Sequence, residues 1–142
     1  MPFEWLAMRI GEERERRQRE ASVLERLPRG LEELHTHLAT CVATYTEAFG
    51  AESAEIQFAD GHIRVTVRGE KDGKWEPRAK IEISSVSNPP SFRVEREEGT
   101  QSIEVGVLPG NKLFYREGEE YLTMEELTRR ILDRAFFPKL VE

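Results

Sequence analysis

The sequence predicts a single α+β domain over residues 1–142: a six-stranded, mainly antiparallel β-meander with two helices across its apolar face. Three observations support this. Leucines recur at spacings of three and four between residues 23 and 49, apolar residues alternate between 54 and 117, and a capped amphipathic pattern covers 122–137. A chain of 142 residues buries roughly two-thirds of its unfolded surface without metals or disulfides.

Residues 1–27 are expected to form an amino-terminal helical arm. Its start is apolar, with Phe3, Trp5 and Met8, and either covers the edge of the core or anchors a partner or membrane. A membrane-surface helix would carry a cationic face, which this segment lacks. Residues 12–20 follow with four Glu and four Arg, several of them four apart with the acid first, which favours helix ion pairs. Because these charges cancel, the arm is not a nucleic-acid-binding segment.

Residues 29–49 are predicted to be the core helix. Pro28 removes a backbone donor and Gly30 weakens the site further, so we expect a kink or a break between helices 12–27 and 29–49. The back of the second helix is small and nearly uncharged, where a solvated face usually carries Lys and Glu. Something is therefore expected to cover this back face, either helix 12–27 folded over it or a second subunit. Its residues are Thr36, Ala39, Thr40 and Ala43.

The residues from 54 to 117 alternate with a period of two, which is typical of strands. Asp60-Gly61 is a strong hairpin signal, and a two-residue turn there would place Phe58 opposite Ile63. We predict a loop over 69–74 and a strand end at Asn88-Pro89-Pro90. One face of the resulting sheet is apolar and the other carries mixed charge, which indicates a single-sided antiparallel sheet.

The last hairpin and the last helix are also specified locally. A three-residue loop at 109–111 would pair Val107 with Leu113 and leave Phe114 over Gly106, where the glycine offers room. Thr123 and Glu126 form a capping box at the start of the helix over 122–137, and Pro138 ends it.

No motif indicates catalysis, a cofactor or a metal, so we predict no catalytic, cofactor-binding or metal-ligating residue. His35 and His37 diverge on a helix, while His37 and Cys41 share a face but supply only two ligands. Cys41 lies on the apolar stripe, where burial raises a thiol's pKa. Six glutamates lie near strand ends or loops and are expected to be solvated, with a weak divalent-cation site in the 117–120 loop as the alternative: Glu95, Glu97, Glu98, Glu117, Glu119 and Glu120.

The net charge of −6 disfavours a general affinity for nucleic acid or anionic membranes. No run of residues approaches the ~20 apolar residues needed to span a bilayer. These observations favour a soluble cytoplasmic protein.

Two functions are consistent with this sequence. The first is a non-catalytic protein–protein interaction or adaptor module, expected as a homodimer or as the partner of another protein, with a candidate surface formed by Thr36, Ala39, Thr40, Ala43, Phe3 and Trp5. The alternative is a carrier of an apolar small molecule in a cavity between sheet and helices, lined by Tyr45, Phe58, Phe92 and Tyr115. An enzyme with an unrecognised site and a nucleic-acid-binding protein are less favoured alternatives.

Overall fold

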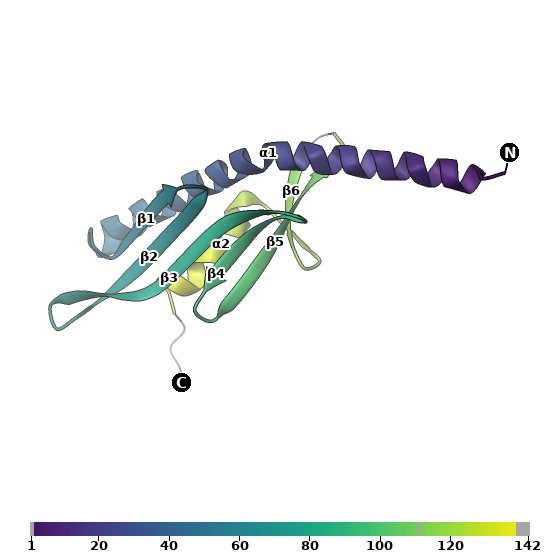
Figure 1. Cartoon of the computed structure of the whole chain (residues 1–142). Coiled ribbons are helices and arrows are strands. Elements are labelled where there is room, and N and C mark those ends of the chain that lie inside the picture. The colour runs from purple at the N-terminus through teal and green to yellow at the C-terminus, as the bar shows by residue number, and fades with distance from the viewer. Residues whose placement is uncertain (1, 111, 139–142) are drawn as a thin grey trace.

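The computed structural model describes residues 2–110 and 112–138, and within them it confirms the α+β class (Figure 1). A long helix, α1 (Glu4–Phe49), precedes an antiparallel sheet, and a second helix, α2 (Met124–Phe136), follows it. Both helices contribute to one hydrophobic core with the apolar face of the sheet.

Helix α1 is continuous through Pro28, which corrects the prediction of separate helices over 12–27 and 29–49. Pro28 is exposed, so its ring lies on the solvent side of the helix. Its neighbours Leu27 and Leu31 are buried on the core side, and this packing holds both flanks of the proline in one helix. Tertiary burial therefore outweighs the roughly 3 kcal/mol that a proline costs inside a helix.

The described residues form a seven-stranded sheet whose order follows the sequence, with every neighbouring pair antiparallel. The strands are β1 (Ala54–Ala59), β2 (His62–Lys71), β3 (Lys74–Ser87), β4 (Pro90–Arg96), β5 (Gly99–Leu108), β6 (Lys112–Glu117) and β7 (Glu120–Leu122). The prediction of six strands missed β7. This strand is too short to show an alternating pattern, and it is placed by the pairing of Leu122 with Tyr115.

The hairpin registers agree with the sequence in detail. Phe58 pairs with Ile63 across the Asp60-Gly61 turn, and Gly106 pairs with Phe114 as predicted. A Cβ atom at Gly106 would lie 2.2 Å from Cζ of Phe114, so the ring occupies the space that the glycine leaves. The expected loop over 69–74 is shorter in the structure, because β2 and β3 extend to a two-residue turn at Asp72-Gly73.

The two faces of the sheet differ as expected. Inward side chains such as Ile63, Ile83 and Val94 are fully buried beneath the helices. The outward face carries ion pairs, including Arg64 Nε to Glu82 Oε2 at 3.5 Å and Arg93 Nε to Glu95 Oε1 at 2.9 Å. The sheet is therefore single-sided, and its apolar face packs against α1 and α2.

Helix α2 is fixed at both ends. The predicted capping box is present: Glu126 N–H donates to Thr123 Oγ1, and Thr123 N–H donates to Glu126 Oε1, both at 3.1 Å. At the other end, Nη2 of Arg78 on β3 donates to the carbonyl oxygens of Ala135 (2.8 Å) and Phe136 (3.1 Å). A cation at these terminal carbonyls also complements the helix dipole.

Candidate interaction surface

The amino-terminal part of α1, residues 4–22, projects beyond the sheet and α2 (Figure 1). We call these residues the arm. The first buried residue of α1 is Val23, so no side chain of the arm belongs to the core. At 1.5 Å per residue, the arm is about 28 Å long.

The arm is held in a helix by pairs between its own charges. Arg16 donates to Glu13 at 2.8 and 3.0 Å and to Glu20 at 2.6 Å, and Arg17 donates to Glu13 at 3.1 Å. Hydrogen bonds from Arg16 and then Arg17 lower the pKa of Glu13 to about 2. Exposed pairs of this kind contribute only a few tenths of a kcal/mol each. The packed part of α1 supplies the costly helix nucleus, from which the arm propagates.

The tip of the arm is apolar and open to solvent. Its large apolar side chains are Trp5 (65% exposed), Leu6 (42%), Met8 (67%) and Ile10 (45%), and the cap residue Phe3 before them is 67% exposed. The prediction that this segment covers the edge of the core is therefore wrong, because the continuous helix carries it away from the sheet. Exposed apolar patches on soluble proteins often mark sites of association.

The back face of α1 is also open. Thr36, Thr40 and Ala43 are exposed and Ala39 is half-buried, and the arm does not fold over them because it continues the same helix. Thr36 Oγ1 donates to the carbonyl oxygen of Glu32 (3.1 Å) and Thr40 Oγ1 to that of Thr36 (3.0 Å). Their hydroxyl groups are thus satisfied within the helix, which makes this face less polar than its composition suggests.

The structure divides the predicted surface into two separate parts. Trp5 and Thr40 lie on one continuous helix, about 50 Å apart at 1.5 Å per residue. Phe3 and Trp5 at the tip therefore cannot act together with Thr36, Ala39, Thr40 and Ala43 within one chain. Only a second molecule could contact both regions.

A groove of about 560 Å³ lies beside the back face, between α1 and α2. Thr36, Thr40 and Cys41 line it from α1, and Leu132 and Phe136 line it from α2. Burial, followed by the nearby Glu125 carboxylate, raises the pKa of the Cys41 thiol. The groove therefore has apolar side chains and a thiol of raised pKa on its walls, with Glu125, Arg129 and Asp133 also in its lining.

The four aromatic residues predicted to line a cavity lie in three different places. Phe92 is fully buried and stacks on Tyr115 with ring centroids 5.7 Å apart, and burial raises the pKa of Tyr115 to about 12. Tyr45 stacks on Phe136 at 4.1 Å, and Phe58 contacts the ring of His35 at 4.9 Å. Only Phe92 and Tyr115 are brought together, and they fill the core beneath Gly30.

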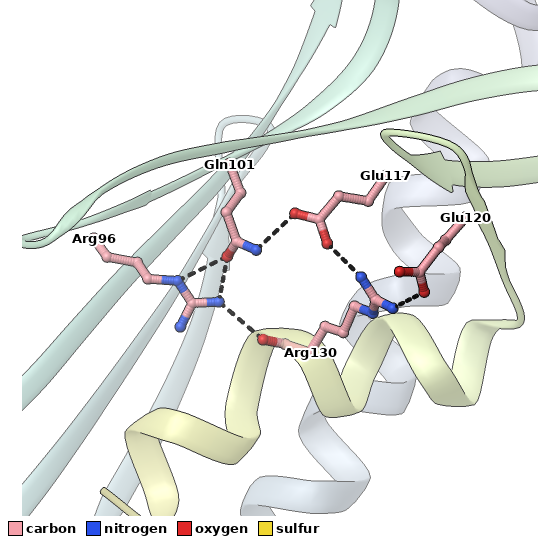
Figure 2. Close-up of polar contacts among 5 residues, drawn as sticks. All are labelled: Arg96, Gln101, Glu117, Glu120 and Arg130. Atoms are coloured by element: carbon pink, nitrogen blue, oxygen red, sulfur yellow. Dashed lines mark hydrogen bonds and ion pairs between the residues drawn. The ribbon is translucent and has the colours of Figure 1, made fainter. Parts of the chain in front are cut away.

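A polar cluster between the sheet and α2 was not identified from the sequence (Figure 2). Arg96 ends β4, Gln101 lies on β5, Glu117 ends β6 and Arg130 lies on α2. These residues follow no common spacing in the sequence, because only the meander brings the ends of three strands to one edge of the helix. No sequence signal could have indicated this set.

The cluster connects α2 to the sheet. Arg96 donates to the backbone oxygens of Ile131 (2.9 Å) and Arg130 (3.1 Å), and to Gln101 Oε1 at 2.7 and 3.0 Å. Gln101 Nε2 donates to Glu117 Oε2 (2.8 Å), and Arg130 Nη1 donates to Glu117 Oε1 (2.9 Å). Arg130 also contacts Glu120. Burial lowers the pKa of Arg96 below its usual range.

This cluster is best explained as a structural clamp. The carboxylate of Glu117 is engaged at both oxygens, one by Gln101 and one by Arg130. General acid–base catalysis requires a carboxyl group whose environment leaves it ready to exchange a proton with substrate. The geometry instead uses these charges to hold α2 against strand ends.

The described residues contain no group of three or more His, Cys, Asp or Glu side chains that could hold a metal ion. In the same part of the chain, no helix combines the length and apolar character that crossing a membrane requires. Comparisons with protein-family models, with curated proteins and with solved structures find no match.

Proposed function

We propose that this protein is a non-catalytic protein–protein interaction module that forms a homodimer through the arm of α1. The observation that carries the proposal is the arm itself: 19 helical residues with no buried side chain, whose tip carries four exposed apolar residues beside the exposed cap residue Phe3. A helix without core contacts contributes little to the stability of its own domain, whereas it offers two long faces to a partner.

The charge distribution supports association through this region. The whole chain carries −6, but residues 12–20 contain four Glu and four Arg. Two arms can therefore approach each other without the net repulsion that two acidic bodies experience. The ionisable groups with shifted pKa values in the arm and at the start of α2 are accounted for by ion pairs and a helix cap. They give no support to a catalytic centre.

Sedimentation velocity of the full chain between about 1 and 100 µM, which brackets the affinity of a weak dimer, would test the proposal. We expect a concentration-dependent dimer that the double variant Leu6→Glu/Ile10→Glu abolishes. The matched control is Thr36→Glu/Thr40→Glu, which adds the same charge to the exposed back face and should leave the dimer intact. A dimer lost only in the control would assign the interface to the back face. A wild-type monomer at the highest concentration would contradict the homodimer.

The groove between α1 and α2 supports a second candidate, a carrier of an apolar small molecule. Its volume of about 560 Å³ lies within the range of roughly 300–1,000 Å³ that is typical of ligand sites. Native mass spectrometry of freshly purified protein would test this function. A ligand that stays bound to wild type and is absent from Leu132→Trp, whose larger side chain would fill the groove, would support a carrier. A wild-type mass equal to that of the chain alone would contradict it.

A further inference from the structure

The helical stripe that is apolar in the packed part of α1 continues into the arm, where its central residues are charged. Spacings of four and three connect Leu6, Ile10, Glu13, Arg17, Glu20, Leu24 and Leu27 on one side of the helix. Leu27 is buried under the sheet and Leu24 is half-buried at the boundary. We call this side of the helix from Leu6 to Leu24 the arm seam. It is apolar at both ends and charged in the middle.

We propose that two copies of the chain pair antiparallel along the arm seam, with a two-fold axis near residue 15. This inference rests on the proposed homodimer and specifies its geometry. Glu13 of one copy then lies opposite Arg17 of the second copy, and the symmetry creates the same contact a second time. Both side chains are accessible for such a contact, with side-chain exposures of 42% for Glu13 and 75% for Arg17.

Charge complementarity selects this arrangement over the parallel one. A parallel pair in register places Glu13 against Glu13 and Arg17 against Arg17, so side chains of like charge face each other at both positions. The antiparallel pair matches opposite charges at both central layers, and complementary charges at such positions set the orientation of paired helices. An isologous interface of this kind is closed, so association stops at the dimer.

The same register matches the apolar ends of the seam. With Glu13 opposite Arg17, Leu6 of one copy lies opposite Leu24 of the other, at the margin of its core. Ile10 then packs on the aliphatic part of Glu20, whose carboxylate is already held by Arg16 at 2.6 Å. Each arm would thus extend the hydrophobic core of the other copy while its charges remain paired.

The arm offers the clearance that this pairing needs. Leu6 to Leu24 spans about 27 Å at 1.5 Å per residue. Because the arm projects beyond the sheet and α2 (Figure 1), the two sheets of the proposed pair lie at opposite ends. An interface formed by one side of two helical segments of this length, with charged residues at its centre, belongs to the weak, transient class of protein–protein interfaces. We therefore expect a dissociation constant on the order of micromolar.

Charge reversal within the seam tests the geometry by sedimentation velocity. Glu13→Arg leaves only arginine at positions 13 and 17, and Arg17→Glu leaves only glutamate. Each variant alone should dimerise at least about tenfold more weakly than wild type, because its central layers become repulsive. An equimolar mixture of the two variants should recover a dimer of wild-type strength, because every layer then joins opposite charges.

The matched controls are two separate single variants, Glu15→Arg and Arg19→Glu. These residues form an i,i+4 pair at 3.9 Å on another side of the arm. Each control change should alter the dimer affinity less than about twofold, as exposed charges away from an interface do. Recovery in the mixture cannot arise from damaged helices, so it separates loss of pairing from loss of arm structure.

The outcomes distinguish this inference from the proposed function. Dimers of unchanged affinity in both seam variants would overturn the antiparallel register while leaving the homodimer standing. Failure of the mixture to recover would overturn it as well. A wild-type monomer at the highest concentration would overturn both the proposed homodimer and its geometry. Weakening in the single variants with recovery in the mixture supports both.

Discussion

The two parts of α1 have similar spacing but different surroundings. The part from Val23 to Val42 contains all seven buried residues of the helix, including Leu34 and Leu38, which are fully buried. The arm, residues 4–22, contains none and is held by pairs between exposed charges. One part of the helix completes the core, whereas the other part has no buried side chain and leaves its apolar tip in solvent.

The largest test of this contrast compares two leucines on the same stripe. Leu34→Ala leaves a cavity in the core and should lower the free energy of unfolding by about 3 kcal/mol. Leu6→Ala removes a side chain that is 42% exposed and should change it by less than about 0.5 kcal/mol. Urea unfolding at the lowest practical protein concentration, where the chain is monomeric, gives both values. A comparable loss in Leu6→Ala would show that the arm belongs to the cooperative core.

Pro28→Ala tests the junction between the two parts. The change restores the backbone hydrogen bond that a proline cannot donate. The gain in helix stability is partly offset, because alanine leaves the unfolded chain more conformational freedom than proline does. The net effect should be an increase of about 1–2 kcal/mol in the free energy of unfolding. Thermal unfolding with Arg29→Ala as the neighbouring control measures this effect. An unchanged or lower melting temperature would mean that the packing of α1 on the sheet needs the proline.

The glycines of α1 provide a smaller comparison. A Cβ atom added at Gly11, in the arm, would have nothing within 4 Å, whereas one added at Gly30 would meet Phe92 and Tyr115 at 3.4 Å. Gly11→Ala should strengthen the arm by up to about 1 kcal/mol and slow amide exchange there. Gly30→Ala should stabilise the helix less, because the close contact of the added Cβ with Phe92 and Tyr115 offsets part of the gain in helix propensity. Hydrogen exchange read by mass spectrometry separates the two, and equal effects would contradict the contrast.

The smallest expected effect is electrostatic. The pKa of Glu13 is lowered from 4.5 to about 2 in the folded protein, so its contribution to the arm is present above pH 4.5 and is lost as pH falls towards 2. NMR titration of the Glu13 side chain in low salt and in about 1 M salt would measure its pKa. The shift should shrink in high salt because the group is exposed. Glu13→Gln should remove this part of the pH dependence, and a normal pKa would contradict the observed pairing.

The sequence predicted features that depend on near neighbours. The Asp60-Gly61 turn set the pairing of Phe58 with Ile63, and the space above Gly106 accommodated Phe114. The capping box at Thr123 placed the start of α2 within two residues. These predictions hold because turn conformation, strand alternation and helix caps are decided within a few residues. Of the ion pairs expected at i,i+4 spacing in the arm, Glu13–Arg17 and Glu15–Arg19 are present. Arg16 pairs with Glu13 and Glu20 instead of Glu12.

The candidate site was predictable only in part. Phe3 and Trp5 are exposed as an interaction surface requires, and Thr36, Thr40 and Ala43 are exposed as well. Their separation along one continuous helix could not be predicted, because local propensity alone indicated a kink or break at Pro28. The fold instead keeps this residue helical by burying the leucines on either side of it.

Short-range patterns were enough to specify the class of the fold, the registers of its hairpins and the neutral, helix-forming character of the arm. The continuity of α1, the seventh strand and the clamp in which Arg96 meets α2 emerged only when the chain was folded. These features depend on contacts between segments far apart in the chain, whose energies local sequence does not contain. The same long-range packing left the arm outside the core, and it is there that we propose the protein binds a second copy of itself.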